Sequence, residues 1–190
     1  MNPLALIPGK YYHIYNRGNN RENLFIEERN YHYFMKCYAH HIEPVAQTYA
    51  YCLLRNHFHF LVCIKDDPLP KPPSQAFSNL FNAYAQAFNK MYDRTGALFQ
   101  RPFGRIRIDS DEYFRVLVVY IHQNPQKHGF VDDFHHWPFS SIHALVSTRP
   151  THLQRETVID WFGNLDNLTE SHSFPIEENQ IAALIRDDFD

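Results

Sequence analysis

Several features of secreted and membrane proteins are missing from this sequence of 190 residues. It has only 3 cysteines, scattered at positions 37, 52 and 63 without a Cys-x-x-Cys pair or any metal-binding spacing, so we expect free, buried thiols in a reducing compartment. No run of eighteen apolar residues is present, and the first residues lack the basic start and hydrophobic length of a signal peptide. We therefore expect a cytoplasmic protein that makes no membrane contact.

Tryptophan is also scarce, with 2 residues, but 16 Phe and 12 Tyr bring the aromatic content to 16%, and 44% of all residues are hydrophobic. This is enough for the core of one ordinary domain. Charge is unevenly distributed, because residues 147–190 hold 3 basic and 9 acidic side chains (net −6), whereas residues 1–146 hold 15 and 12 (net +3). We expect a mildly basic domain over 1–146, compatible with a nucleic-acid partner, and an acidic, partly helical extension over 147–190. In this extension, the sequence predicts short helices over about 154–162 and 176–187 with a polar linker between them.

The stretch from Asn56 to Val62 (Asn-His-Phe-His-Phe-Leu-Val) alternates in the manner of a half-buried β-strand. The alternation places His57 and His59 on one face, and Phe58 and Phe60 on the other. Two imidazoles two residues apart on a rigid strand form a ready pair of ligands for a first-row divalent metal. The same pattern also fits a core strand with two hydrogen-bonded histidines, so the spacing alone leaves both interpretations open.

The segments around this stretch predict an α+β fold. Residues 10–17 and 46–54 have the composition of strands, and the apolar spacing over 28–42 indicates a helix. A proline-rich linker over 65–73 precedes a second helix, which Ser74 is expected to cap. The order strand, helix, strand, strand, helix, strand, helix is close to the ferredoxin-like split βαβ plan, an antiparallel sheet covered by helices.

A third helix is predicted from about residue 110 up to Pro125, because the residue before a proline is pushed away from α geometry. Tyr120 and Asn124 are four residues apart and therefore lie on one face of this helix. Gln123 lies about 60° from Tyr120 on the other side, and His122 points roughly the opposite way.

Four blocks of the sequence resemble one family of proteins. His57-Phe58-His59 resembles the His-hydrophobic-His signature of the HUH single-strand nucleases, and Tyr120–Pro125 (Tyr-Ile-His-Gln-Asn-Pro) is similar to the Tyr-Ile-His-x-Asn-Pro block of the REP-associated tyrosine transposases. Tyr51–Asn56 (Tyr-Cys-Leu-Leu-Arg-Asn) and Leu98–Phe103 (Leu-Phe-Gln-Arg-Pro-Phe) resemble the same family, which more often has proline where this chain has Arg55. The blocks occur in the family order, and the resemblance stops before the acidic extension.

This resemblance implies a ferredoxin-like fold of the HUH nuclease type and a metal-dependent, transposase-like endonuclease and strand transferase acting on single-stranded, palindromic DNA folded as a hairpin. Tyr120 would form a 5′-phosphotyrosine and release a 3′-hydroxyl, and the aryl phosphate keeps a good leaving group for rejoining. His57, His59 and Asn124 would hold Mg²⁺ or Mn²⁺ with open positions for phosphate, and Gln123 is the alternative third ligand. The resemblance also implies a monomer that uses its own tyrosine helix.

Arginines in two regions are candidates for contacting DNA. One pair brackets a loop rich in amide side chains after the first strand, and another alternates with isoleucines along a predicted strand at 104–108. A solvated edge strand is the other interpretation of the second pair. The complete set of candidates is Arg17, Arg21, Arg101, Arg105 and Arg107.

The acidic extension leads to a separate hypothesis. Its charge of −6 has the same sign as that of DNA, so residues 147–190 are hypothesised to lie where bound DNA or a partner subunit would lie. Deleting them should then increase the affinity for single-stranded DNA.

Two other functions fit parts of the pattern. The first is a ferredoxin-like module that binds single-stranded nucleic acid without catalysis, in which Tyr120→Phe would leave every function intact. The second is a metalloprotein of other chemistry that adds further histidines, such as His135 or His136, to the pair, and four histidine ligands would favour a closed structural zinc site. Tyr113, seven residues before Tyr120 on a similar helix face, is the alternative nucleophile.

Overall fold

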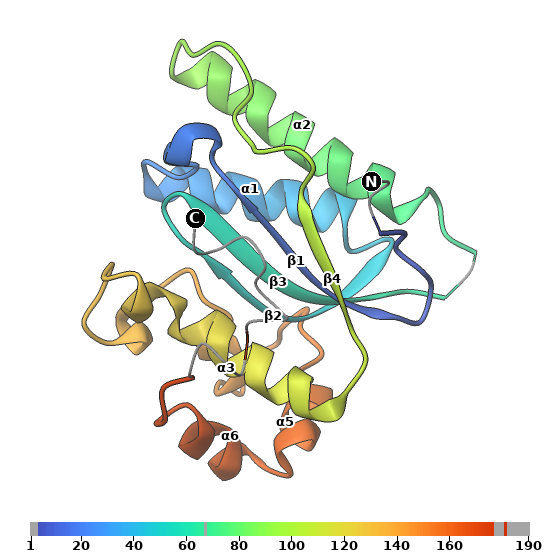
Figure 1. Ribbon diagram of the computed structural model, residues 1–190, viewed down its shortest axis with the longest axis vertical. Coiled ribbons are helices and arrows are strands. Elements are labelled where there is room, and N and C mark those ends of the chain that lie inside the picture. The colour runs from blue at the N-terminus through green and yellow to red at the C-terminus, as the bar shows by residue number, and fades with distance from the viewer. Residues whose placement is uncertain (1–3, 67, 177–180, 182–190) are drawn as a thin grey trace.

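The computed structural model of the chain describes residues 4–66, 68–176 and 181. At its centre is a four-stranded sheet in the order β2-β3-β1-β4, in which every neighbouring pair is antiparallel (Figure 1). The strands are β1 (Tyr11–Arg17), β2 (Ala46–Leu53), β3 (His57–Ile64) and β4 (Gly104–Ile108).

Helices form the longer connections of this sheet and continue beyond it. α1 (Glu28–His41) links β1 to β2 and α2 (Pro73–Met91) links β3 to β4, which confirms the predicted α+β, ferredoxin-like class. Two residues separate β4 from α3 (Asp111–Lys127). No helix within the described residues is long and apolar enough to cross a membrane. The remaining helical segments are the 3-10 turns Asn19–Arg21 and Phe134–His136, and α4 (Ile142–Leu145), α5 (Arg155–Phe162) and α6 (Leu165–Ser171).

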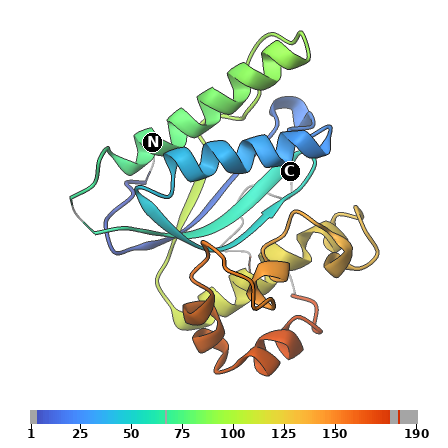
Figure 2. The same cartoon turned by 180° about the vertical axis from the view of Figure 1, so that it is seen from behind.

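Different helices cover the two faces of the sheet, with α1 and α2 on one face and α3 on the other (Figures 1 and 2). The alternation of β3 decides which side chains meet which layer. Between ring centroids, Phe58 lies 5.1 Å from Phe34 of α1 and 5.7 Å from Phe81 of α2. His59 lies 5.6 Å from Tyr120 of α3. The predicted division of this strand into a phenylalanine face and a histidine face is confirmed.

α3 continues past the residue that was expected to end it. Pro125 lies inside the helix, which runs to Lys127. A proline removes one helical hydrogen bond, and here the pattern resumes at once, because the backbone N–H of His128 donates to the carbonyl of Asn124 at 2.9 Å. The predicted end of the helix is therefore wrong, and Asn124 lies within the last full turn.

The C-terminal extension packs against α3 and β2. Trp161 of α5 stacks on Phe114 of α3 with ring centroids 4.8 Å apart, and on Tyr49 of β2 at 5.1 Å. α5 agrees with the helix predicted over about 154–162, but α6 occupies a stretch that was predicted to be a polar linker, so that prediction is wrong. The helix predicted over 176–187 lies almost entirely outside the described residues.

Candidate active site

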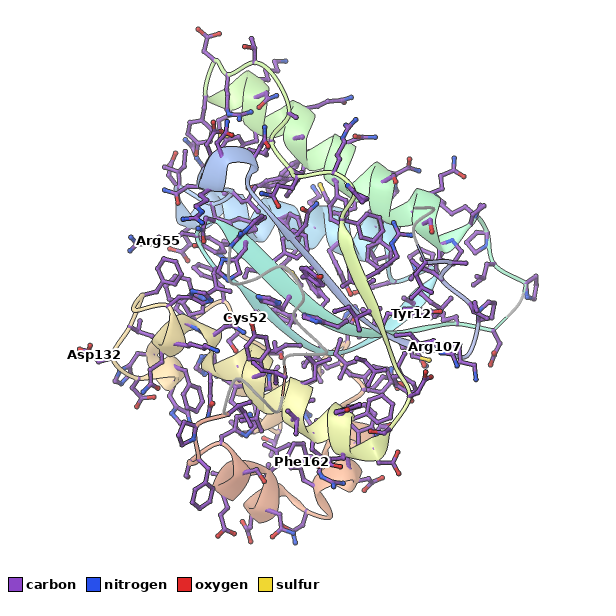
Figure 3. The ribbon with its side chains drawn as sticks, viewed as in Figure 1. Tyr12, Cys52, Arg55, Arg107, Asp132 and Phe162 are labelled. Atoms are coloured by element: carbon purple, nitrogen blue, oxygen red, sulfur yellow. The ribbon has the colours of Figure 1, made fainter. Side chains whose placement is uncertain are left out.

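Both histidines of the signature come from the beginning of β3, a central strand of the sheet. β3 lies between β2 and β1, so its backbone is hydrogen-bonded on both sides and holds the side chains in fixed positions. His57 and His59 are buried, with ring centroids 5.2 Å apart and ring planes at 88°. Figure 3 shows Cys52, which pairs with His59 from the edge strand β2, beside α3.

A contact at Nδ1 orients each of the two rings. Nδ1 of His57 donates a hydrogen bond to Oδ1 of Asn56 at 2.7 Å, since an amide oxygen only accepts. Nδ1 of His59 lies 2.9 Å from Nε2 of His13, a buried residue of β1. Each ring therefore turns a buried Nε2 to the other side, and this is the nitrogen that binds a metal when Nδ1 is held by another group. Sequence analysis missed His13, because only the pairing of β1 with β3 brings it to His59.

Tyr120 and Asn124 approach the histidine pair from α3. The Tyr120 ring is 2% exposed and stands edge-on to His59, with 5.6 Å between centroids and 77° between planes. Asn124, one turn later, is fully buried, and its Nδ2 donates to the backbone oxygen of Tyr120 at 2.9 Å. Its Oδ1 is also buried and has no hydrogen-bond partner among the described residues. An amide oxygen in this situation suits a hard divalent cation.

The other polar residues of this turn point elsewhere. The Gln123 amide donates to the backbone oxygens of residues 172 and 174 at 2.9 and 2.8 Å, and its oxygen accepts from the backbone N–H of residue 176 at 3.2 Å. Nε2 of His122 lies 2.7 Å from Oγ of Ser141. Of His122, Gln123 and Asn124, it is Asn124 that lies on the same helix face as Tyr120. Its side-chain oxygen has no hydrogen-bond partner among the described residues.

The environment of His59 favours the form of imidazole that can bind a metal. Burial lowers its pKa well below the ordinary range, and the nearby His13, His128 and Arg17 lower the pKa further. The ring is therefore neutral at physiological pH and keeps the lone pair that a ligand needs.

The alternative zinc site does not form within the part of the chain that the structure describes. No three His, Cys, Asp or Glu side chains there lie together as a metal site. His135 and His136, the further histidines of this alternative, are both exposed, and Nδ1 of His135 lies 2.7 Å from the carboxylate of Asp133.

Two basic side chains, one near the histidine pair and one near Tyr120, were not singled out from the sequence. The His128 ring follows the last turn of α3 and lies 4.7 Å from His57 between centroids. Nζ of Lys127 lies 5.5 Å from the centroid of the Tyr120 ring. Lys127 follows Tyr120 by about two helical turns, so its position could have been predicted only if the helix had been known to continue beyond Pro125.

The candidate arginines are divided between the two faces of the sheet. Arg17 pairs with His57 across β1 and β3, at the end of the sheet. Arg105 and Arg107 occupy the alternate positions of β4 and so point to the face that α1 and α2 cover. Figure 3 shows Arg107 towards the opposite end of the sheet from Arg55, which adjoins the start of β3. The other two candidates are exposed in connecting segments: Arg21 and Arg101.

A buried series of hydrogen bonds joins α3 to the extension. Nδ1 of His172 lies 2.7 Å from the backbone oxygen of Leu168, and Nε2 of His172 lies 2.8 Å from Nδ1 of His122. Because a backbone oxygen only accepts, His172 donates to Leu168, His122 donates to His172, and Ser141 donates to His122. Both rings are neutral in this arrangement.

Protonation of His172 is expected to destabilise the protein in acid. Burial, with a smaller contribution from His135 and opposed by the bond to Leu168, lowers the pKa of His172 from 6.5 to about 4. Between these values the unfolded chain binds a proton that the folded chain does not, so stability falls as pH falls, by roughly 1.4 kcal/mol per pH unit. Urea unfolding at several pH values measures this slope. His172→Gln should flatten it relative to the exposed control His152→Gln, and equal slopes in both variants would contradict the prediction.

Comparisons with known proteins bear on both sequence and fold. The chain is 30% identical over 128 residues to a protein of Haemophilus influenzae named as a REP-associated tyrosine transposase, a match that covers 63% of this chain and 69% of the relative. No family model matches the chain. The fold is similar to the solved structure of a REP-associated tyrosine transposase bound to a REP hairpin, with a TM-score of 0.62 and 22% identity over 79% of this chain and 88% of that one.

Proposed function

We propose that this chain, which belongs to the family of REP-associated tyrosine transposases, cuts and rejoins single-stranded DNA beside a hairpin. In this proposal the reaction proceeds through a covalent bond to Tyr120. The observation that carries this proposal is the position of the Tyr120 ring, 5.6 Å from the ring of His59 and one helical turn from the buried oxygen of Asn124. A nucleophile, two imidazoles and an amide oxygen in this arrangement support phosphoryl transfer.

Three side chains fit a divalent ion, Mg²⁺ or Mn²⁺. His57 and His59 would bind through Nε2, because their Nδ1 atoms are held by Asn56 and His13, and Asn124 would bind through Oδ1. An ion bound here supplies positive charge that offsets the charge growing on the phosphoryl oxygens. All three side chains are neutral ligands, so they leave that positive charge available to the DNA.

Tyr120 performs the covalent step. Its phenol oxygen forms a bond to phosphorus as the bond from phosphorus to the 3′ oxygen breaks, while the phenol loses a proton and the departing 3′ oxygen gains one. The products are a 5′-phosphotyrosine and a strand that ends in a 3′-hydroxyl. Attack by a 3′-hydroxyl reverses the step and joins strands. Nζ of Lys127 lies 5.5 Å from the centroid of the Tyr120 ring, so its positive charge would stabilise negative charge on the phenol oxygen and on the phosphate.

A DNA hairpin is the substrate that fits the family and the site. The solved relative is bound to a REP hairpin. In this chain the histidine pair lies near the end of the sheet where the loop after β1 meets the β2–β3 turn, joined by a hydrogen bond from the backbone of Gly18 to that of Asn56 at 2.8 Å. Arg17 and Arg21 lie at this end, and we assign to them the phosphates nearest the cleavage point.

The active form in this proposal is a monomer. Tyr120 lies against His59 of its own chain, so both halves of the site come from one molecule. Residues 1–146 form the catalytic domain, and residues 147–190 form an extension whose Trp161 packs on α3.

The test is incubation of the full chain with a hairpin that carries single-stranded flanks and a label at each end, in Mg²⁺ or Mn²⁺. We expect a covalent protein–DNA adduct that retains the 3′ label, and a released fragment that retains the 5′ label and ends in a 3′-hydroxyl. Peptide mapping should place the adduct at Tyr120. Hairpin binding without an adduct in either metal would instead identify a non-catalytic single-strand-binding module.

Removing acidic charge from the extension is expected to increase the affinity for single-stranded DNA. Deleting residues 147–190 would also uncover the rings under Trp161, so substitution by the matching amides is the sharper test. The gain should be several-fold at low salt and should shrink as salt screens the charges. Exposed acidic residues in the described part of the extension are Glu156, Asp160, Asp166 and Glu170.

Fluorescence anisotropy with a labelled single strand measures this gain. Glu28→Gln, an exposed site on α1, is the control for a charge change elsewhere on the surface. Unchanged affinity after all four substitutions would remove the hypothesis that the extension repels DNA.

A further inference from the structure

Three residues at the end of α3 follow one another at intervals of four: Tyr120, Asn124 and His128. Because four residues are slightly more than one turn, their side chains form a stripe along one side of the helix. His128 caps the end of the helix, and its backbone N–H donates to the carbonyl of Asn124 at 2.9 Å. The stripe therefore carries the proposed nucleophile first, the proposed amide ligand second and an imidazole third.

β3 passes this stripe in the opposite direction, since α3 runs towards the side of the sheet where β3 begins (Figure 1). The Tyr120 ring lies 5.6 Å from that of His59, and the His128 ring lies 4.7 Å from that of His57, with 73° between the latter two planes. The two imidazoles of the strand are 5.2 Å apart. Tyr120 and His128 are thus the two ends of a series of four rings, and the eight residues between their positions span about 12 Å along the helix axis.

The order of these rings matches the geometry of phosphoryl transfer. The attacking and departing oxygens of this reaction lie roughly in line, on opposite sides of the phosphorus. A phosphate that Tyr120 attacks from the His59 end therefore turns its departing 3′ oxygen towards the His57 end. His128 is the side chain of the stripe at that end, and it is exposed, so DNA can reach its ring.

The surroundings of His128 suit bound DNA. Lys127 precedes it in the chain, and Arg17 lies directly opposite His57 in the pairing of β1 with β3, so the Arg17 side chain belongs to the same face of the sheet. Positive charge in this region favours backbone phosphates. The alternative role for His128 is structural, since a histidine at the end of a helix interacts favourably with the helix dipole. Only a contact with the departing oxygen makes its effect depend on the identity of the departing atom.

We propose that His128 is a catalytic residue that holds the 3′ oxygen of the departing strand, an inference that rests on the proposed function. The phenol oxygen of Tyr120 bonds to phosphorus as the bond from phosphorus to the 3′ oxygen breaks. A ring N–H of His128 then donates a hydrogen bond to the 3′ oxygen, on which negative charge grows. The phenol proton passes to water and the 3′ oxygen takes a proton from water, so His128 keeps its own protonation state. The same hydrogen bond holds the 3′-hydroxyl in place for rejoining.

The test compares two hairpins that differ in one atom at the cleavage position, where the second carries sulfur in place of the 3′ oxygen. A departing thiolate needs little help from a hydrogen-bond donor, because a thiol is a far stronger acid than an alcohol. With the full chain in Mn²⁺, His128→Ala should cleave the oxygen hairpin roughly a hundred-fold more slowly than the wild type does, and the sulfur hairpin at nearly the wild-type rate. His128→Gln keeps an N–H donor and should recover part of the lost rate. His152→Ala, at an exposed histidine of the extension, should behave as the wild type does.

Two further measurements separate this role from indirect effects of the substitution. Titration calorimetry with Mn²⁺ and the full chain, without DNA, should give the wild-type affinity for His128→Ala, because His57, His59 and Asn124 are unchanged. Rejoining, measured by adding a strand with a 3′-hydroxyl to the isolated adduct, should slow by about the same factor as cleavage, because it is the same step in reverse.

Each contrary result has a distinct meaning. If His128→Ala slows the cleavage of both hairpins equally, or of neither, His128 does not contact the departing atom and the inference is wrong. A loss of Mn²⁺ affinity in His128→Ala would mean that this residue acts through His57, which also overturns the inference. In these cases an adduct formed by the wild-type protein leaves the proposed function standing. If the wild-type protein forms no adduct with either hairpin, the proposed function fails and this inference fails with it.

Discussion

Replacing Tyr120 with phenylalanine is expected to abolish the covalent protein–DNA adduct and to lower strand cleavage by at least roughly a thousand-fold. The substitution removes only the hydroxyl that attacks phosphorus. The ring remains to fill its buried position against His59, so folding and hairpin affinity should be retained. Denaturing gels with end-labelled hairpin in Mn²⁺ measure the adduct, and anisotropy measures the affinity.

Tyr113→Phe is the matched control for this prediction. Tyr113 lies on the same helix, near its start, and is 40% exposed. It should form the adduct at the wild-type rate. An adduct that survives Tyr120→Phe and disappears in Tyr113→Phe would transfer the nucleophile to Tyr113 and contradict the assignment.

Replacing Asn124 with alanine is expected to weaken Mn²⁺ binding by at least about a hundred-fold and to remove cleavage with it. The reason is the buried Oδ1, which has no hydrogen-bond partner among the described residues and which alanine lacks. Titration calorimetry with Mn²⁺ and the full chain, without DNA, gives a readout that does not depend on activity. Asn124→Asp keeps an oxygen at the position and should restore Mn²⁺ binding.

Gln123→Ala separates the two candidate third ligands. Its amide is bonded to the backbone of residues 172–176, so its loss should loosen the extension and leave Mn²⁺ affinity unchanged. Loss of Mn²⁺ binding in Gln123→Ala, with normal binding in Asn124→Ala, would reverse the assignment. His57→Ala and His59→Ala should both weaken the binding, and normal Mn²⁺ affinity in either would remove that residue from the site.

The histidine strand was predictable because its alternation is a local property. Whatever strand lies beside it, a period of two sends His57 and His59 to one face and Phe58 to the other, and the structure has this arrangement. The relation between Tyr120 and Asn124 was predictable for the same kind of reason, since four residues are about one helical turn.

Element boundaries were less predictable because single contacts decide them. Ser74 was expected to cap α2, but Pro73 occupies the first helical position, where a missing N–H costs nothing, and Ser74 lies inside the helix. α6 was missed although Asn164 caps it by accepting from the backbone N–H of Asn167 at 2.8 Å. A short polar segment with one buried leucine resembles a linker until its packing is known.

The partners of the site residues depend on which strands pair. His13 is close to His59 only because β1 lies next to β3. Alternation predicted that Arg105 and Arg107 share a face, but which face depends on the register of β4 against β1. Arg107 bonds Asp109 at 2.7 Å there, so a DNA contact by Arg107 requires that pair to open.

The two-residue connection between β4 and α3, Asp109 and Ser110, sets how far the nucleophile can travel. When fully extended, this connection spans only about 10 Å. The Ser110 hydroxyl also accepts a hydrogen bond from the backbone N–H of Tyr113. Exchange of α3 between two molecules would require the first turn of the helix to unwind. Each molecule should therefore cleave and rejoin DNA as a monomer, and the turnover number per molecule should not change when the protein is diluted.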